Sequence, residues 1–367
     1  MERNDPRYQA YVEILKEELI PAMGCTEPIA LAYAAAKARE VLGVLPDSVQ
    51  LQVSGSIIKN VKSVIVPNTG HLKGMEAAVA AGIIAGSAEK ELEVISEVSE
   101  EKKSAIRDYL QTVPITIEHT EQGHVFDIVV TERCGQDYAR VRIADYHTNI
   151  CRIEKNGTVL YEVPLLDETV QEDTRADRSL LNMQDIWDFA ETADLRDVAD
   201  LLERQIRYNN AIAEEGLLGD YGANIGRVLL TTYGNDVSNR AKAKAAAGSD
   251  ARMNGCELPV IINSGSGNQG ITASVPAVVY AEELGVSRET LYRALAVSNL
   301  STIHIKAHIG TLSAYCGAVS AGCGAGAGIT YLYGGGYEQI KHTLVNAMAI
   351  TSGIICDGAK PLSLIHI

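Results

Sequence analysis

The sequence has little positive charge for its length. Its 367 residues carry 32 Lys and Arg side chains against 47 Asp and Glu, which gives a formal net charge of −15, and no segment concentrates basic residues. Binding to nucleic acid or to an anionic membrane needs a dense group of cations that replaces counterions. The composition therefore argues against both partners and favours small molecules as ligands.

The N-terminus also lacks the basic stretch and apolar core of a secretory signal peptide. We therefore expect a cytoplasmic protein, in which a reducing environment keeps the seven cysteines as thiols or metal ligands. The segment 307–337 contains no Asp, Glu, Lys or Arg, but Gly, Ala, Ser, Thr and Tyr dominate it. Its Leu, Ile and Val content is too low for favourable membrane insertion, so it predicts a buried, closely packed helix.

No internal repeat is present, which argues against a solenoid, and the length predicts about two domains. Helical periodicity, then alternating apolar and polar residues, then almost wholly helical periodicity predict an α+β fold. It comprises N-terminal helices, a small α/β domain and a mostly α-helical catalytic domain. The predicted boundaries are 1–45 for the N-terminal helices, which carry Cys25 and pack on the catalytic domain, 46–165 for the α+β domain, 166–180 for a polar linker, 181–361 for the helical domain and 362–367 for a tail.

Four local patterns make specific predictions within these boundaries. Thr26 is the predicted N-cap of a helix that reaches about residue 42. Residues 61–66 predict a strand, and residues 223–246 predict a single helix. Asn156-Gly157, between two alternating runs, predicts a hairpin turn.

The cysteines lack the compact Cys-x-x-Cys spacing that is typical of many metal sites. Three of them nevertheless lie beside glycine or at the start of a predicted helix, where the helix N-terminus favours the metal-binding thiolate: Cys25, Cys316 and Cys356. Three cysteines without a fourth would hold three irons of a cubane cluster and leave one iron open as a Lewis acid. The alternative is that all seven cysteines are buried small hydrophobic residues.

The segment 264–270 combines glycines with hydroxyl and amide donors and leads into a predicted helix. Its donors could converge on an anion such as a carboxylate. It lacks the Gly-Lys-Ser/Thr ending of a nucleotide loop and does not fit the dinucleotide fingerprint. The candidate substrate-binding residues are Ser264, Gly265, Ser266, Asn268 and Gln269, and the alternative is a structural turn.

Three stretches occur in the order Gly24-Cys25-Thr26-Glu27-Pro28-Ile29-Ala30-Leu31-Ala32, Asn263-Ser264-Gly265-Ser266-Gly267-Asn268-Gln269-Gly270 and Cys356-Asp357-Gly358-Ala359-Lys360-Pro361. Together they resemble the bacterial and archaeal L-cysteine desulfidase family, which is related to the catalytic chain of iron-sulfur L-serine dehydratases. The resemblance implies an oxygen-sensitive lyase that needs no pyridoxal phosphate and converts L-cysteine into sulfide, ammonia and pyruvate. It also implies one 4Fe-4S cluster per chain, held by Cys25, Cys316 and Cys356.

Further residues fall in stretches similar to family motifs or beside the proposed ligands. Asn68 and His147 are candidate substrate contacts, although both could simply belong to turns. Lys306, His308 and Lys360 are candidate bases. His304 and His308, an i,i+4 pair, could alternatively share a metal, but no Glu accompanies them in a His-Glu-x-x-His pattern.

Two other functions stay open: an L-serine dehydratase of the same mechanism, and an inactive iron-sulfur or amino-acid-binding regulator. A homodimer is also left open. Residues 362–367 resemble the translation of a transposase sequencing adapter, and members of the resembled family continue past this point with more helix. We therefore expect a truncated chain that is unstable or inactive as written, with an ordinary apolar tail as the alternative.

Overall fold

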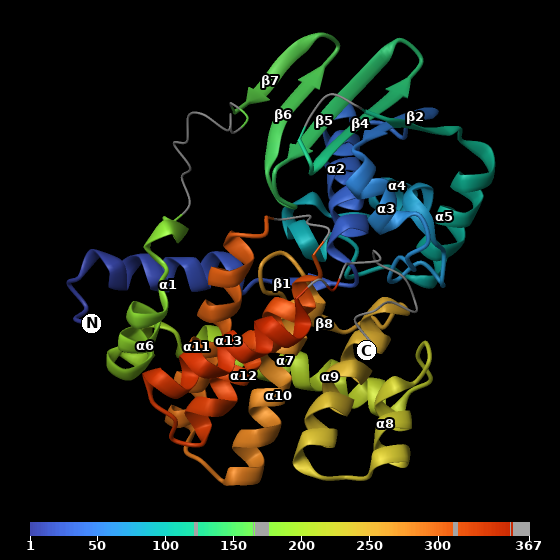
Figure 1. Ribbon diagram of the computed structural model, residues 1–367. Helices are drawn as coiled ribbons and strands as arrows, with labels where there is room; N and C mark the ends of the chain where they lie inside the picture. Colours follow the sequence, from blue (N-terminus) through green and yellow to red (C-terminus); the bar gives the residue numbers. More distant parts are fainter. Residues whose placement is uncertain (121–123, 164, 166–175, 311–314, 353, 355–367) are drawn as a thin grey trace.

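The computed structural model describes residues 1–120, 124–163, 165, 176–310, 315–352 and 354. A six-stranded sheet with its helices forms one unit, and a group of helices forms the other (Figure 1). This arrangement confirms the predicted α+β fold. The tail 362–367, Cys356 and Lys360 lie outside the described residues.

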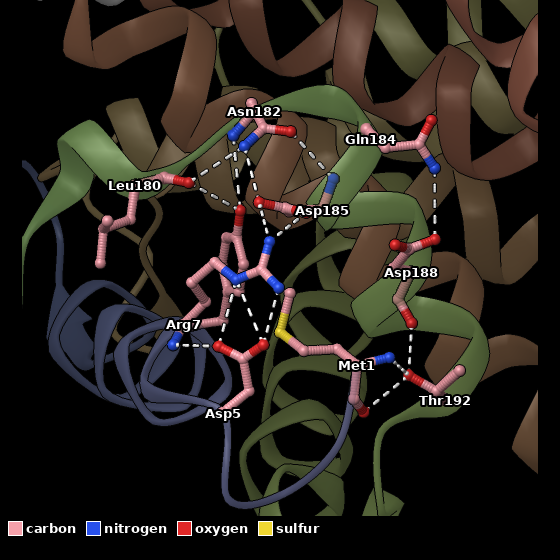
Figure 2. A network of polar contacts seen from close by, with 10 residues as sticks. Met1, Asp5, Arg7, Leu180, Asn182, Gln184, Asp185, Asp188 and Thr192 are labelled. Carbon is pink, nitrogen blue, oxygen red and sulfur yellow. Dashed lines mark hydrogen bonds and ion pairs between the residues drawn. The ribbon is translucent and has the colours of Figure 1, made fainter.

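The N-terminal helix α1 (Pro6–Glu18) packs in the hydrophobic core of the helical unit. It begins where the Asp5 side chain accepts a hydrogen bond from the Arg7 amide, with proline at its first position. The Arg7 guanidinium pairs with Asp185 of α6 (Met183–Thr192) at 2.9 Å (Figure 2). Polar contacts therefore hold the start of the chain against a helix that lies far away in sequence.

The sheet has the strand order β3-β2-β4-β5-β6-β7, in which β2 and β3 are parallel and the other neighbours are antiparallel. Helix α2 packs directly on β4 and β5, and α4 packs on α2. Alternate residues of β2 face this core, so its burial has the period of two expected for a strand with one covered face. The elements of this unit are α2 (Thr26–Leu42), β2 (Ser48–Val53), α3 (Gly55–Val61), α4 (Gly74–Ala85), the 3-10 helix η1 (Ala88–Glu93), α5 (Glu100–Thr112), β3 (Ile115–His119), β4 (Asp127–Cys134), β5 (Asp137–Ala144), β6 (Ile150–Lys155) and β7 (Thr158–Glu162).

The helical unit follows, and a short antiparallel pair of strands, β1 (Pro21–Met23) and β8 (Pro259–Ile261), lies between the two units (Figure 1). Two 3-10 helices, η2 (Arg178–Leu180) and η3 (Leu195–Asp197), flank α6. The other helices are α7 (Ala199–Leu218), α8 (Ile225–Tyr233), α9 (Val237–Met253), α10 (Gly267–Leu284), α11 (Arg288–Ala307), α12 (Gly317–Leu332) and α13 (Tyr337–Thr351).

Helices α11 and α12 pack backbone to backbone through glycine. A Cβ atom at Gly324 would lie 2.5 Å from the Ser298 carbonyl oxygen, and one at Gly328 would lie 2.8 Å from the Ala294 carbonyl oxygen. Contact positions rise along α12 as they fall along α11, so the helices are antiparallel. The C-terminal end of α11 and the N-terminal end of α12 therefore lie at the same end of the pair.

The predicted close packing of segment 307–337 is thus confirmed for α12, but the segment is not one helix, because α11 ends at Ala307 and α12 begins at Gly317. Among the described residues, no helix is long and apolar enough to cross a membrane.

Local predictions differ from the structure at three places. Cys25, not Thr26, is the N-cap of α2, because the Thr26 hydroxyl binds a neighbouring loop instead of its own helix. Residues 61–66 form no strand; one isolated bridge joins Ile65 to Lys73. The predicted helix 223–246 is two helices, because Gly234 adopts a positive φ of 87° and Asp236 caps the start of α9.

The predicted hairpin turn at Asn156-Gly157 is confirmed, with φ values of 50° and 81° at the two residues. It joins β6 to β7, which is formed by the second of the two alternating runs.

Candidate functional site

Cys25 lies at the start of α2, where a sharp turn delivers the chain from β1. Gly24 has a φ of 64°, and a Cβ atom there would lie 2.7 Å from Pro67, so only glycine fits. The Cys25 thiol is buried and donates to the Met253 sulfur at 3.3 Å. Burial raises its pKa to about 11, although the Arg252 charge acts in the opposite direction. In the chain by itself, burial therefore raises the pKa of Cys25 by more than the helix N-terminus, which we expected to favour the thiolate, lowers it.

The loop before α10 contains two consecutive residues with positive φ, Ser264 at 49° and Gly265 at 78°. A reciprocal pair of backbone hydrogen bonds between Asn263 and Ser266 closes the turn at 3.1 Å. The Asn263 side-chain amide donates to Asn299 of α11 at 2.9 Å. The loop therefore has a fixed shape that the helical core supports from below.

Asn299 belongs to a buried group of amide side chains. It exchanges two hydrogen bonds with Gln205 of α7, at 2.8 and 2.9 Å. All three side chains, Asn263, Gln205 and Asn299, are fully buried. Burial of an amide side chain is unfavourable unless the amide is hydrogen-bonded. The hydrogen bonds of this group therefore specify how α7, α11 and the loop fit together.

The same loop contacts the sheet unit from the other side. The Thr26 hydroxyl donates to the Gly265 carbonyl oxygen at 2.9 Å. A Cβ atom at Gly265 would lie 3.1 Å from Cε1 of His147, which follows β5. Glu27 accepts a hydrogen bond from the Asn60 amide of α3 at 2.9 Å. The N-terminus of α2, the β5–β6 loop and the N-terminus of α10 therefore meet.

His147 is buried and lies edge-on to Phe126, with 4.7 Å between ring centroids. Burial lowers the pKa of its imidazole, and the Arg252 charge contributes in the same direction, while Glu27 opposes them. The ring is therefore neutral near pH 7. Its Nε2 atom has no hydrogen-bond partner among the residues that the structure describes.

Arg252, in the last turn of α9, contributes a guanidinium to the same place. Its Nη1 atom donates to Oδ1 of Asn268 at 3.1 Å. A Cβ atom at Gly267 would lie 2.2 Å from Arg252 Nε, so glycine lets the guanidinium lie against the first turn of α10. The Nε atom has no partner within the described part of the chain.

The N-terminus of α12 completes the group. Cys316 is its buried N-cap, and a Cβ atom at Gly317 would lie 2.4 Å from the Gln269 amide nitrogen. The Oε1 atom of Gln269 is buried and has no partner in the described ranges. The Cys316 amide donates to the Ile354 carbonyl oxygen at 3.4 Å. The chain two residues before Cys356 therefore lies beside Cys316.

The structure thus brings most of the predicted site residues together through a continuous run of contacts. The three helices that meet here, α2, α10 and α12, all lack a side-chain hydrogen bond at the N-cap. The starts of these helices lie close together, and because a helix N-terminus carries a partial positive charge, an anion is favoured near them. The predicted members are Cys25, His147, Ser264, Gly265, Ser266, Asn268, Gln269 and Cys316.

The three-cysteine cluster stays a prediction, because Cys356 lies outside the described residues. Within the described residues, no group of three or more His, Cys, Asp and Glu side chains gathers as a metal site. Cys134 and Cys151 lie on β4 and β6, and Cys323 lies in the apolar core of the helical unit. The burial of Cys151 and Cys323 is consistent with the alternative that the sequence allowed, of cysteine as a small buried hydrophobic residue, whereas Cys134 is only partly buried.

Asn68, also a predicted substrate contact, has its amide donors engaged by the protein. It donates to the Ile95 carbonyl oxygen at 2.8 Å and to the Met23 sulfur at 3.0 Å. These contacts tie the loop after α3 to η1 and β1, next to the turn that presents Cys25.

Two of the three candidate bases lie at the end of α11. Lys306 is buried, and its ammonium donates to the Gly310 carbonyl oxygen. His308 is exposed and contacts His304 edge-on, with ring centroids 5.2 Å apart. This end of α11 lies at the same end of the helix pair as the N-terminus of α12. The third candidate, Lys360, lies outside the described residues.

Sequence reasoning missed Arg252, Glu27 and Asn60. Arginine is usually exposed, which hides a buried one in a sequence. The signal was its neighbourhood: residues 245–251 are almost all Ala, Gly and Ser, which is typical of a helix packed on several sides. An arginine at the end of such a helix is placed among other elements instead of in solvent.

Comparison with known proteins identifies related chains. The sequence model of the serine dehydratase alpha chain family matches residues 89–363. A UPF0597 protein of Desulfitobacterium hafniense, DSY1109, is 61% identical over 361 residues, which cover 98% of this chain and 84% of the relative. UPF0597 proteins of Lachnoclostridium phytofermentans and Treponema denticola are 52% and 46% identical, over 96% and 98% of this chain and 84% of each relative.

Proposed function

Since this chain belongs to the serine dehydratase alpha chain family, we propose that it is a lyase that eliminates the β-substituent of a small L-amino acid. One structural observation carries the proposal. Three uncapped helix N-termini meet around buried polar atoms that have no partner in the described residues: Arg252 Nε, His147 Nε2 and Gln269 Oε1. Such atoms are unfavourable in a folded chain unless a ligand binds them.

The family is associated with an iron-sulfur cluster, and the residues present fit one. Cys25 and Cys316 are buried N-caps of two of the converging helices, and Ile354 brings the chain that leads to Cys356 next to Cys316. We propose that these three thiolates hold one 4Fe-4S cluster, without pyridoxal phosphate. When bound, the cluster supplies an open iron that acts as a Lewis acid toward the leaving group.

The protein residues would bind the amino acid and move its α-proton. The loop Ser264–Gln269 offers hydroxyl, amide and backbone donors beside the first turn of α10. His147 is a neutral imidazole whose Nε2 has no hydrogen-bond partner in the described part of the chain, so it is suited to accept the α-proton. Lys306, His308 and Lys360 stay as alternative bases. Loss of the α-proton and the β-substituent leaves aminoacrylate, whose imine tautomer hydrolyses in water to pyruvate and ammonia.

We propose L-cysteine as the substrate, with sulfide as the leaving group, because the motifs around Cys25, Asn263 and Cys356 resemble the L-cysteine desulfidases. L-serine, losing water by the same mechanism, is the second candidate, which the name of the matching family favours. A regulator that binds an amino acid without turnover is a third reading. The enzyme would act on its small-molecule substrate in a reducing cytoplasm.

The test is turnover under anaerobic conditions after the cluster has been reconstituted. Sulfide and pyruvate formed in equal amounts from L-cysteine would support the desulfidase. Pyruvate from L-serine alone would assign a serine dehydratase. Binding of either amino acid without pyruvate formation would contradict the lyase and leave the regulator.

A further inference from the structure

Arg252 is a buried cation that has no ion-pair partner among the described residues. Arg252 is only 3% exposed, and its guanidinium donates a hydrogen bond to Asn268, which is uncharged. Among the described residues, no carboxylate forms an ion pair with it. A buried guanidinium is unfavourable unless a negative charge and further hydrogen bonds compensate for the lost water.

A second positive feature lies directly beside it. The first turn of α10 has no side-chain cap. The side chain of its N-cap residue accepts no hydrogen bond from the backbone amides of this turn. Because Gly267 lacks a Cβ atom, the guanidinium lies against this turn. The positive end of a helix and an arginine repel each other, and an anion bound between them would compensate for this repulsion. Both features therefore predict the same ligand group.

Two buried hydrogen-bond acceptors belong to residues near these positive groups. Oε1 of Gln269, one residue further along α10 than Asn268, is a buried acceptor without a partner among the described residues. The His147 ring lies beside the loop through its Cε1 and Nδ1 atoms, and its Nε2 atom also has no partner there. A ligand with an anionic end at Arg252 and an ammonium toward Oε1 of Gln269 would satisfy both of these atoms and leave Nε2 of His147 for the α-proton. An α-amino acid zwitterion has this pattern.

We propose that Arg252 binds the α-carboxylate of the substrate against the first turn of α10. The inference rests on the proposed function for the identity of the ligand as an amino acid. A planar guanidinium pairs with a carboxylate through parallel, charge-assisted hydrogen bonds, which fixes orientation as well as affinity. Asn268 holds one arm of the fork and so positions it.

The binding test uses L-alanine, which has the carboxylate and ammonium but no leaving group, and ethylamine, which lacks the carboxylate. Calorimetry is performed on the cluster-loaded protein without oxygen, for wild type, Arg252→Met and Arg252→Lys. We expect wild type to bind L-alanine far more tightly than ethylamine. Arg252→Met should weaken L-alanine binding by roughly 10- to 100-fold, the range for a charged hydrogen bond, and Arg252→Lys by less.

A stability measurement separates binding from a structural role. Arg142 is the matched control, because it is an arginine that does have a buried partner, Asp127, at 2.7 Å. Without ligand, Arg252→Met should leave the melting temperature unchanged or raise it, since a lone buried charge is removed. Arg142→Met should lower it, since Asp127 loses its partner.

The outcomes distinguish this inference from the proposed function. If wild type binds L-alanine and Arg252→Met does not, but neither L-cysteine nor L-serine yields pyruvate, Arg252 is the carboxylate site and the lyase is wrong. If wild type turns over either substrate while Arg252→Met keeps its KM and its affinity for L-alanine, the assignment of Arg252 is wrong. Failure of wild type to bind L-alanine, or a loss of stability in Arg252→Met as large as in Arg142→Met, also overturns it.

Discussion

The buried amide group at Asn299 offers a sharp test of how the substrate loop is held. In Asn299→Leu, the side chain keeps a similar size but loses its hydrogen bonds to Gln205 and Asn263. Both partners are fully buried, so neither can bind water instead. Each orphaned buried polar side chain is unfavourable by about 1–3 kcal/mol, so for the two partners we expect a total destabilisation of about 2–6 kcal/mol.

Urea denaturation of the cluster-free protein, followed by circular dichroism, measures this change. The control is Gln184→Leu, which removes an exposed hydrogen bond to Asp188 in α6 (Figure 2). We expect that change to stay within about 0.5 kcal/mol, as for most surface substitutions.

A double variant tests the cause. In Gln205→Leu with Asn299→Leu, both amides of the exchanging pair become apolar, and only the Asn263 amide is orphaned. Its destabilisation should therefore be clearly smaller than the sum of the two single changes, because removing both partners is nearly neutral. Strict additivity, or an effect of Asn299→Leu no larger than that of Gln184→Leu, would refute the reasoning.

Three further outcomes are expected. Glu132 is fully buried on β4, and burial raises the pKa of its carboxyl well above 4.5. The folded state therefore keeps a proton that the unfolded state releases as pH rises above about 4.5, so stability falls with rising pH. Glu132→Gln should raise the melting temperature, by more at pH 8 than at pH 5, and an equal gain at both would contradict this. Cys316→Ala should abolish the visible absorbance of the cluster, whereas Cys134→Ala on β4 should retain it; equal spectra would remove Cys316 from the ligand set. Asn268→Ala should raise the KM for the amino acid by roughly 10-fold or more, without changing cluster absorbance, and an unchanged KM would move the substrate site elsewhere.

Local signals predicted those parts of the fold that local chemistry decides. Asn156-Gly157 predicted its hairpin because both residues tolerate positive φ, which the tight turn requires. The loop before α10 was predicted from its glycines and its hydroxyl and amide donors, and only the structure shows the positive φ of Ser264 and Gly265. The glycines of α12 indicated close packing because only glycine lets two helix backbones approach so far.

The parts that tertiary contacts decide could not be predicted in this way. Residues 61–66 are apolar enough for a strand and most of them are buried, but they do not pair in the sheet, and Ile65 forms only an isolated bridge to Lys73. Thr26 had the chemistry of an N-cap, yet its hydroxyl is used by Gly265, which lies 239 residues away in sequence. Arg252 was missed for the same reason, because its role depends on elements that only the folded chain brings next to it.

The contact between Gly265 and His147 has a consequence for how this protein changes over generations. One residue belongs to the helical unit and the other to the sheet unit, and with a φ of 78° and an imidazole 3.1 Å from a would-be Cβ, Gly265 has almost no freedom to mutate. A larger side chain at Gly265 would be accepted only if a substitution at His147 had first made room for it. The two units must therefore evolve together. Residues at the contact between them should diverge more slowly than the sequence that separates them.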